Sequence, residues 1–214
     1  MAKSNPMFSN SRDKILCVVG RTGVGKDSLV KRLCEEYPNL FNEFISYTDR
    51  PQRNTDIDGY HHWFITTEEF DKMKEEAGEN GILAYTKIYS EENPDGAQYM
   101  CLKSQMGESN VYIIDPKGIK WINENFPDIK TPIINIRAHM SDVLMRCEDR
   151  DDFDKMSVRM EQENEQFDEF EKLVDETYKN PDNDGMTAMI VMNSGKFDTV
   201  YEIFTEQALS LISL

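Results

Sequence analysis

The residues with the clearest chemistry form a glycine-rich loop, residues 20–26, spelled GRTGVGK. Backbone N–H groups of such a loop can hold phosphate oxygens, and the dipole of a following helix favours the same negative charge. The spelling matches GxxxxGK, in which the lysine reaches the β- and γ-phosphates of a nucleoside triphosphate. A short apolar run before the loop and helical spacing after it supply the required strand and helix. The loop therefore predicts binding of a nucleoside triphosphate.

One position beside the loop departs from the usual pattern. The residue after the lysine is ordinarily Ser or Thr, whose hydroxyl binds Mg²⁺, whereas here Asp27 precedes Ser28. Either Asp27 replaces the hydroxyl as an oxygen ligand, or Ser28 takes a related role. The alternative is that Asp27 only stabilises the helix N-terminus. A carboxylate this close to phosphates repels them unless a cation lies between.

A second group of cationic side chains lies in SYTDRPQR, residues 46–53, which is followed by DIDG at residues 56–59. Arg50 and Arg53 are three positions apart on a proline-containing loop and form a fork suited to a second phosphate. In a chain of formal net charge −16, such a pair stands out. The alternative is two ordinary solvated arginines.

Asp115 ends the apolar run VYIID. An acid at the carboxyl end of a buried parallel strand lies at the mouth of a nucleotide crevice, where it can orient Mg²⁺ or hold the acceptor. The alternative is a helix N-cap before Lys117. Of the adjacent His61 and His62, at most one faces a given site if they lie on a strand.

Four arginines surround an acidic stretch at residues 148–154; they are Arg137, Arg146, Arg150 and Arg159. Arginines on a mobile segment can close over a transferring phosphoryl group and neutralise its charge. The alternative is pairing with nearby acids on helix surfaces.

The elements that must position these residues alternate between strands and helices. Strands are predicted at 14–20, 44–48, 61–66, 82–89, 111–115, 132–136 and 188–192. Helices are predicted at 27–37, 68–76, 117–125, 141–150, 157–178 and 197–211, with Ser141 as an N-cap. This alternation predicts an α/β fold with a central parallel sheet flanked by helices. Residues 49–107 interrupt it with short alternating strands and are predicted to form an insertion.

Charge and cysteine content limit the kinds of binding partner and the cellular compartment that we expect. With 40 acidic and 24 basic residues, the chain repels nucleic acid and anionic lipid at long range, so neither is an expected partner. No apolar run approaches the ~20 residues that cross a bilayer. The four cysteines form no CxxC pair, which favours a reducing cytosol over a disulfide or metal framework. Residues 1–13 are predicted to be a flexible lead-in.

Taken in order, these segments resemble the guanylate kinase family from about Lys14 to the C-terminus. GRTGVGKDSL resembles its phosphate loop, SYTDRPQR with DIDGYHHWF its nucleoside-monophosphate-binding segment, and DPKG its strand-end aspartate motif. The resemblance implies a P-loop NTPase core with a five-stranded parallel sheet, residues 14–48, 108–138 and 165–214. It also implies a small mixed α+β monophosphate-binding insertion, residues 49–107, and a helical lid, residues 139–164.

The implied activity is transfer of the γ-phosphoryl group of ATP to GMP or dGMP with Mg²⁺, in a cytoplasmic monomer or homodimer. The implied catalytic residues are Lys26, Arg146, Arg150 and Arg159. The implied ATP-binding residues are Arg21, Thr22, Gly23, Val24, Gly25, Lys26, Asp27, Ser28 and Asn193. The implied monophosphate-binding residues are Ser46, Arg50, Arg53, His62, Tyr99, Cys101 and Asp115. The implied metal ligands are Asp27, Ser28 and Asp115.

Several base-reading positions depart from the family pattern. Ala84 stands where a guanine-reading glutamate is usual, and Cys101 where a base-contacting Ser or Thr is usual. His62 stands where a phosphate-binding tyrosine is usual, although Tyr60 could substitute, and the loop at 90–96 is longer than expected. Because hydrogen-bonding contacts carry base specificity, these changes predict a divergent member with altered or relaxed base choice.

Two other functions remain open at this point. GKDSL also resembles sugar-phosphate kinases of the ribose 1,5-bisphosphate phosphokinase type, which would lack the RPQR and DGYHHWF segments. A non-catalytic guanylate-kinase-like module that binds a protein partner usually loses the phosphate loop or the lid arginines, and this chain keeps both.

Overall fold

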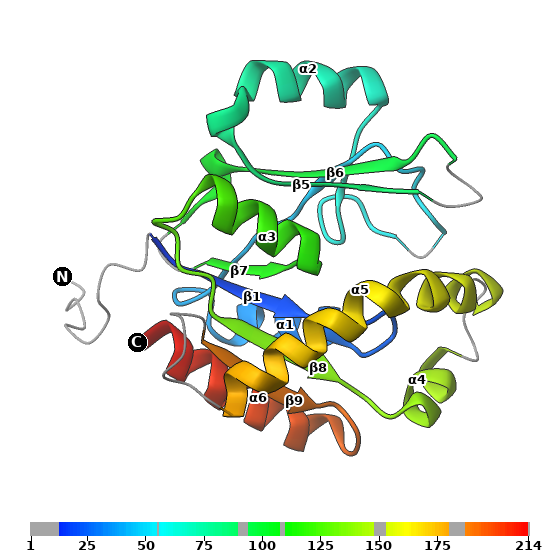
Figure 1. Cartoon of the computed structure of the whole chain (residues 1–214), viewed down its shortest axis with the longest axis vertical. Coiled ribbons are helices and arrows are strands. Elements are labelled where there is room, and N and C mark those ends of the chain that lie inside the picture. The colour runs from blue at the N-terminus through cyan, green and yellow to red at the C-terminus, as the bar shows by residue number, and fades with distance from the viewer. Residues whose placement is uncertain are drawn as a thin grey trace.

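A five-stranded parallel sheet forms the centre of the molecule (Figure 1). In the computed structural model, the described residues are 13–54, 56–89, 94–107, 110–147, 153–179 and 187–213. The strands are β2 (Asn42–Glu43), β7 (Asn110–Ile113), β1 (Ile15–Val19), β8 (Ile133–Arg137) and β9 (Ala188–Met192), in that spatial order. Every neighbouring pair is parallel, which confirms the predicted α/β class.

Helices cover both faces of this sheet because successive side chains of a strand point to opposite sides. Leu16 and Val18 of β1 pack in one cluster with α1 (Lys26–Glu36) and α6 (Phe197–Ser213). The remaining β1 residues pack in a second cluster with α3 (Pro116–Asn125) and α5 (Phe153–Lys179). Figure 1 shows α3 and α5 in front of the sheet. All five β1 residues are buried, so the apolar run before the loop is a core strand.

A smaller mixed sheet lies at one end of the core, at the top of Figure 1. Its order is β4 (Trp63–Phe64), β3 (Tyr47–Thr48), β6 (Ala97–Leu102) and β5 (Ile82–Ile88). Helix α2 (Thr67–Ala77) starts with a capping box between Thr66 and Glu69. The single-turn 3₁₀ helices η2 (Glu79–Gly81) and η3 (Lys103–Gln105) flank β5 and β6.

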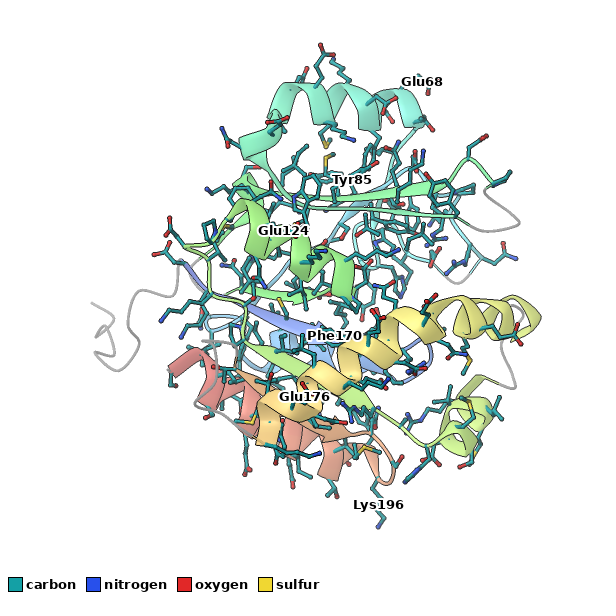
Figure 2. All side chains as sticks on the ribbon, in the orientation of Figure 1. Glu68, Tyr85, Glu124, Phe170, Glu176 and Lys196 are labelled. Carbon is teal, nitrogen blue, oxygen red and sulfur yellow. The ribbon has the colours of Figure 1, made fainter. Side chains whose placement is uncertain are left out.

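Tyr85 of β5, labelled in Figure 2, joins the small sheet to the core. Its ring lies 6.5 Å from Phe70 of α2 and 5.9 Å, edge-on, from Trp121 of α3. Phe70 is fully buried with Ile82 and Met100 in a cluster of its own. The insertion therefore has a small separate core that rests on α3.

Three predictions about individual elements were wrong or incomplete. Of the strand predicted at 44–48, only Tyr47–Thr48 is a strand, β3 of the small sheet, while β2 lies just before the predicted range and joins the central sheet. Strand β6 was not individually predicted. Helix α4 (Met140–Cys147) starts before the expected N-cap Ser141. In its first turn the Val143 N–H donates to the His139 carbonyl oxygen at 3.1 Å. The rest of that predicted helix, the lead-in before residue 13 and residues 90–93 lie outside the described residues.

Helix α5 starts four residues earlier than predicted and passes through the expected boundary between lid and core at residues 164–165 without a break. Of its predicted apolar face, Phe167, Phe170 and Val174 are buried, whereas Leu173 is half exposed. Among the described helices, none is long and apolar enough to cross a membrane.

Candidate functional site

The glycine-rich loop joins the end of β1 to the start of α1 and depends on glycine at defined points. Gly23 and Gly25 have φ of 81° and 87°, in the left-handed region that favours glycine. A Cβ at Gly20 would lie 2.3 Å from the Ile136 carbonyl oxygen, so the loop and β8 approach too closely for a side chain. Gly25 leaves the N-terminus of α1 without a side-chain cap. Uncapped N–H groups at a helix start suit an anion.

Lys26 lies against the loop that precedes it. Its Nζ donates to the carbonyl oxygens of Gly20, at 2.7 Å, and Arg21, at 3.1 Å. Burial lowers the pKa of Lys26, while the nearby carboxylates of Asp27 and Glu163 act in the opposite direction. The ammonium group is therefore held at the loop, where a phosphate would need it.

Asn193 follows β9 and supports the loop from the other side. It is buried, and its Nδ2 donates to the Val24 carbonyl at 2.7 Å. Arg146 of α4 reaches the same point, where its Nη2 donates to the Asn193 carbonyl at 2.6 Å. Two of the expected nucleotide-site residues thus meet at the loop. Arg150 lies outside the described residues, as does the side chain of Arg159.

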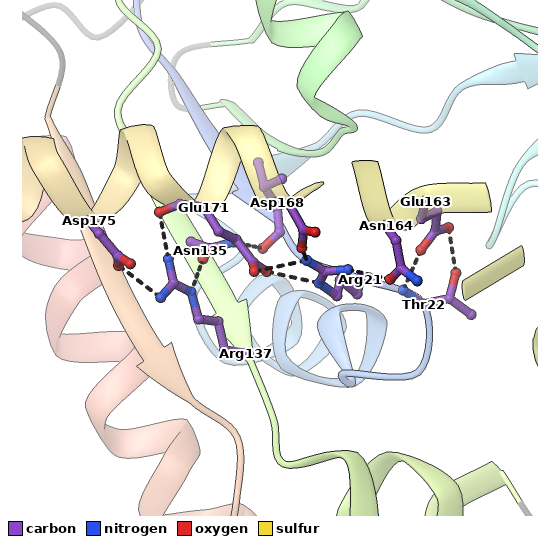
Figure 3. Close-up of polar contacts among 10 residues, drawn as sticks. Arg21, Thr22, Asn135, Arg137, Glu163, Asn164, Asp168, Glu171 and Asp175 are labelled. Carbon is purple, nitrogen blue, oxygen red and sulfur yellow. Dashed lines mark hydrogen bonds and ion pairs between the residues drawn. The ribbon is translucent and has the colours of Figure 1, made fainter. Parts of the chain in front are cut away.

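The loop is also bound by α5, a contact that the sequence did not predict (Figure 3). The Arg21 guanidinium donates to Asn164 at 2.8 Å, to Asp168 at 2.6 Å and to Glu171 at 3.2 and 3.1 Å. Thr22 donates through its N–H and its hydroxyl to Glu163. The only indication of this contact in the sequence is the spacing along α5, because residues 164, 168 and 171 share one helix face.

Arg137 at the end of β8 also makes polar contacts with α5, next to those of Arg21 (Figure 3). It pairs with Asp175 at 2.8 Å, donates to Asn135 at 2.5 Å and donates to the Glu171 carbonyl at 3.2 Å. For Arg137 the structure thus shows pairing with acids on a helix surface, the alternative that the sequence left open.

Arg50 is buried in the insertion, so the alternative of a solvated surface arginine is wrong for this residue. Its Nη2 lies 2.9 Å from an Asp56 oxygen, and its guanidinium carbon lies 5.2 Å from the centre of the Phe64 ring. Burial acts to raise the pKa of Asp56, but the Arg53 N–H and the Arg50 charge outweigh it, so this pKa is lowered. Asp56 accordingly stays charged and fixes Arg50.

His62 and Tyr99 lie next to this arginine. The His62 ring meets Phe64 edge-on at 5.8 Å and Tyr99 at 5.4 Å. Burial and the Arg50 charge lower the pKa of His62 to about 4, so its ring is neutral at pH 7. Arg50 Nε and His62 Nδ1 are both buried without a hydrogen-bond partner in the described part of the chain. Arg50 Nε–H can donate to an anionic oxygen ligand, and His62 Nδ1 can do so in the tautomer that carries its proton there.

Tyr60, the other candidate for the tyrosine position, lies over α1 instead. Its carbonyl accepts from Lys31 Nζ at 2.5 Å, and the same Nζ lies 4.2 Å from its ring centre. Lys31 also pairs with Glu43 at 2.7 Å. Tyr60 therefore links the insertion to the core, and His62 is the residue beside Arg50.

The expected base-reading residues are bonded to other protein groups. Ser46 Oγ lies 2.8 Å from the Tyr112 hydroxyl, and both residues are buried. Cys101 Sγ donates to Gln105 Oε1 at 3.2 Å, and burial raises the pKa of this thiol. Ala84 faces Cys101 across the β5–β6 ladder. The sequence analysis did not identify Tyr112 and Gln105 as partners of Ser46 and Cys101. Their uncharged polar groups are the only sequence feature that could have indicated this role.

Asp115 caps α3, which was the alternative considered for this residue. Its Oδ1 accepts from Gly118 N–H at 2.6 Å. Burial raises the pKa of Asp115, against hydrogen bonds from Gly118 and Thr86. Asp27 and Ser28 are exposed in the first turn of α1. Within the described ranges no group of three or more His, Cys, Asp or Glu side chains is placed to hold a metal.

The parallel sheet, the glycine-rich loop and the uncapped helix after it define a P-loop fold. A sequence profile described as "Guanylate kinase" matches residues 12–185, and the chain belongs to the guanylate kinase family.

Individual relatives agree with this membership. A guanylate kinase of Clostridium acetobutylicum is 29% identical over 114 residues, covering 53% of this chain and 52% of the relative. One of Acinetobacter baylyi is 32% identical over 118 residues, covering 54% of each. The chain thus spans about half the length of these curated relatives. The crystal structure of guanylate kinase from Anaplasma phagocytophilum has a TM-score of 0.61 at 14% identity, covering 92% of this chain and 86% of that one, and shows the shared fold.

Proposed function

We propose that the chain is an ATP-dependent nucleoside monophosphate kinase that transfers the γ-phosphoryl group of ATP to GMP or dGMP. The observation that carries this proposal is a pair of buried nitrogen atoms, Arg50 Nε and His62 Nδ1, which have no hydrogen-bond partner within the described residues. Together with the phosphate loop, they give one molecule two separate places for phosphate. A triphosphate donor and a monophosphate acceptor account for both.

On the donor side, Lys26 and the start of α1 hold the β- and γ-phosphates, and Asn193 supports the loop through Val24. Asp27 and Ser28 are the exposed oxygen groups next to these phosphates, and Asp115 is the third residue that we propose near the metal. Mg²⁺ bound there would neutralise phosphate charge.

On the acceptor side, Arg50 with Arg53, His62 and Tyr99 orients the monophosphate. An oxygen of this phosphate attacks the γ-phosphorus of ATP, the bond from the γ-phosphorus to the β–γ bridging oxygen breaks, and ADP leaves. Arg146, Arg150 and Arg159 neutralise the charge that develops on the transferred group. In this proposal residues 14–48, 108–138 and 165–214 act as the core, 49–107 as the acceptor-binding insertion and 139–164 as the lid.

We also propose relaxed base choice. Ser46 and Cys101 already bond Tyr112 and Gln105, and Ala84 offers no polar atom in its side chain. A site whose polar groups are used internally discriminates poorly between bases. The proposed setting is the cytoplasm, with small-molecule nucleotides as partners, no nucleic acid or membrane, and a monomer or homodimer that light scattering would distinguish.

An assay that couples ADP release to NADH oxidation tests the activity, with GMP, dGMP, AMP, UMP, CMP, TMP and ribose 1,5-bisphosphate as acceptors. The expected result is turnover with GMP and dGMP and measurable turnover with other bases. Lys26→Ala should lower turnover about 10²- to 10³-fold, while Lys72→Ala on the exposed face of α2 should leave it unchanged. Strict GMP preference would reject relaxed base choice alone. Turnover only with the sugar phosphate, or with no acceptor, would reject the proposed reaction.

A further inference from the structure

Glu163 of α5 accepts two hydrogen bonds from Thr22 in the phosphate loop (Figure 3). Its Oε2 accepts from the Thr22 N–H at 3.0 Å, and its Oε1 accepts from the Thr22 hydroxyl at 2.7 Å. Both carboxylate oxygens are therefore bonded to one loop residue. The carboxylate also lies close enough to Lys26 to act on its pKa.

A backbone N–H beside a hydroxyl is the kind of donor pair that phosphate oxygens bind in such loops. Glu163 presents two anionic oxygens to this pair, so it matches in charge and hydrogen bonding what a nucleotide phosphate would present. Both ligands cannot use the same two donor hydrogen atoms at full strength. A phosphate at Thr22 and the observed Glu163 contact therefore exclude each other.

Arg21 holds α5 beside the loop through contacts that do not involve Glu163. Its guanidinium bonds Asn164, Asp168 and Glu171, and lies 5.6 Å from the centre of the Phe167 ring. The Arg21 and Glu171 side chains are each 22% exposed, so this attachment is partly shielded from solvent. Release of Glu163 therefore leaves α5 attached at three other side chains.

We propose that Glu163 is an internal competitor for the nucleotide donor, holding Thr22 until a phosphate of ATP displaces its carboxylate. Arg21 is a positioning residue that keeps α5 next to the loop in both states. This inference rests on the proposed ATP site. The apparent affinity for ATP is reduced by the fraction of molecules in which Glu163 is bound.

Calorimetric titration with MgATP tests the competition. Glu163→Ala should lower the Kd for ATP about 3- to 10-fold. Glu163→Asp keeps the charge but shortens the side chain by one methylene, so it should lower the Kd as well if the contact matters. Glu169→Ala, an exposed acid on the same helix, removes the same charge and should leave the Kd unchanged.

Hydrogen exchange at the Thr22 amide, measured without nucleotide, supplies a second readout. Glu163→Ala should speed exchange there, and Glu169→Ala should not. Unchanged exchange, or an unchanged or higher Kd in an enzyme that still turns over, would overturn the competition alone. A Kd lowered by Glu163→Ala but not by Glu163→Asp would overturn it in favour of simple charge repulsion. Absence of ATP binding in every variant would reject the donor site, and this inference with it.

Discussion

The phosphate loop takes its shape from its own backbone, whereas Arg50 of the insertion is positioned by the side chains around it. Gly20 and Gly25 allow the loop to pass close to Ile136 and Asn193 without a Cβ in the way. Arg50 is fixed instead by Asp56, Phe64 and its own burial. Removal of a loop side chain should therefore affect chemistry first, and removal of the Arg50 side chain should affect stability and chemistry together.

Lys26→Ala is expected to have the largest effect and to separate the two regions most clearly. Turnover should fall about 10²- to 10³-fold, because a positive charge at the phosphates is lost. The thermal midpoint should stay near that of the wild type, because loss of the two Nζ hydrogen bonds is offset by removal of a positive charge whose burial is unfavourable. The coupled assay and a thermal melt measure both. A large fall in the midpoint would contradict the backbone origin of the loop's shape.

Arg50→Ala should lower both properties. With the guanidinium gone, kcat/KM for the monophosphate should fall about 10- to 100-fold. Asp56, whose side chain is 10% exposed, would keep the Arg53 N–H but lose its charged partner, so the free energy of unfolding should fall by about 3 kcal/mol. Titration of the acceptor and urea unfolding measure these. Arg32→Ala, which removes an arginine paired on the surface, is the control, and an equal effect there would refute the role of burial.

Gly25→Ala compares a strained position in the loop with a strained position in the insertion. Gly25 and Gly78 both have positive φ, but only a Cβ at Gly25 meets an atom, Asn193 Nδ2 at 2.5 Å. Gly78→Ala should cost about 1–3 kcal/mol of stability, because φ 63° with ψ 176° suits essentially only glycine, and it should leave ATP binding unchanged. Gly25→Ala should cost about 2–3 kcal/mol with loss of ATP binding. Urea unfolding and ATP titration measure the pair. Loss of ATP binding in both variants, or in neither, would contradict a role for the Asn193 contact.

The smallest expected effect is a pH dependence in the insertion. The folded pKa of His62, about 4, lies below the unfolded value of 6.5, so the unfolded chain binds the proton more readily between these values. Its stabilising contribution is complete above pH 6.5 and is lost as pH falls towards 4. From pH 7 to pH 5 the loss should be about 1–2 kcal/mol.

His62→Phe should lack this step while keeping the aromatic contacts with Phe64 and Tyr99. Asp56 does not interfere, because its pKa is lowered and its own loss occurs at more acidic pH. Urea unfolding of both proteins across this range is the measurement. Parallel curves for the two proteins would show that the ring is not buried as described.

Features encoded by neighbouring residues could be predicted from the sequence. The phosphate loop, the helix after it and the core strands each have a local pattern, and all are present. Strand β2 has no such signal, because its two residues, Asn42 and Glu43, belong to types that are depleted in strands. The attachment of Arg21 to Glu171 spans 150 positions along the chain, and nothing near Arg21 indicates its partner. Burial of Arg50 likewise depends on a fold that places Phe64 and Asp56 around it.

Helix α5 has 27 residues in one unbroken run, which corresponds to about 40 Å of rigid rod. Phe167, Phe170 and Val174 press its middle against the sheet, and its first turns extend beyond that contact (Figure 1). The contact made by these three side chains is thus the point about which the helix would tilt. A small tilt there moves the amino end through a larger arc, carrying Arg159 and Glu163 in the same direction.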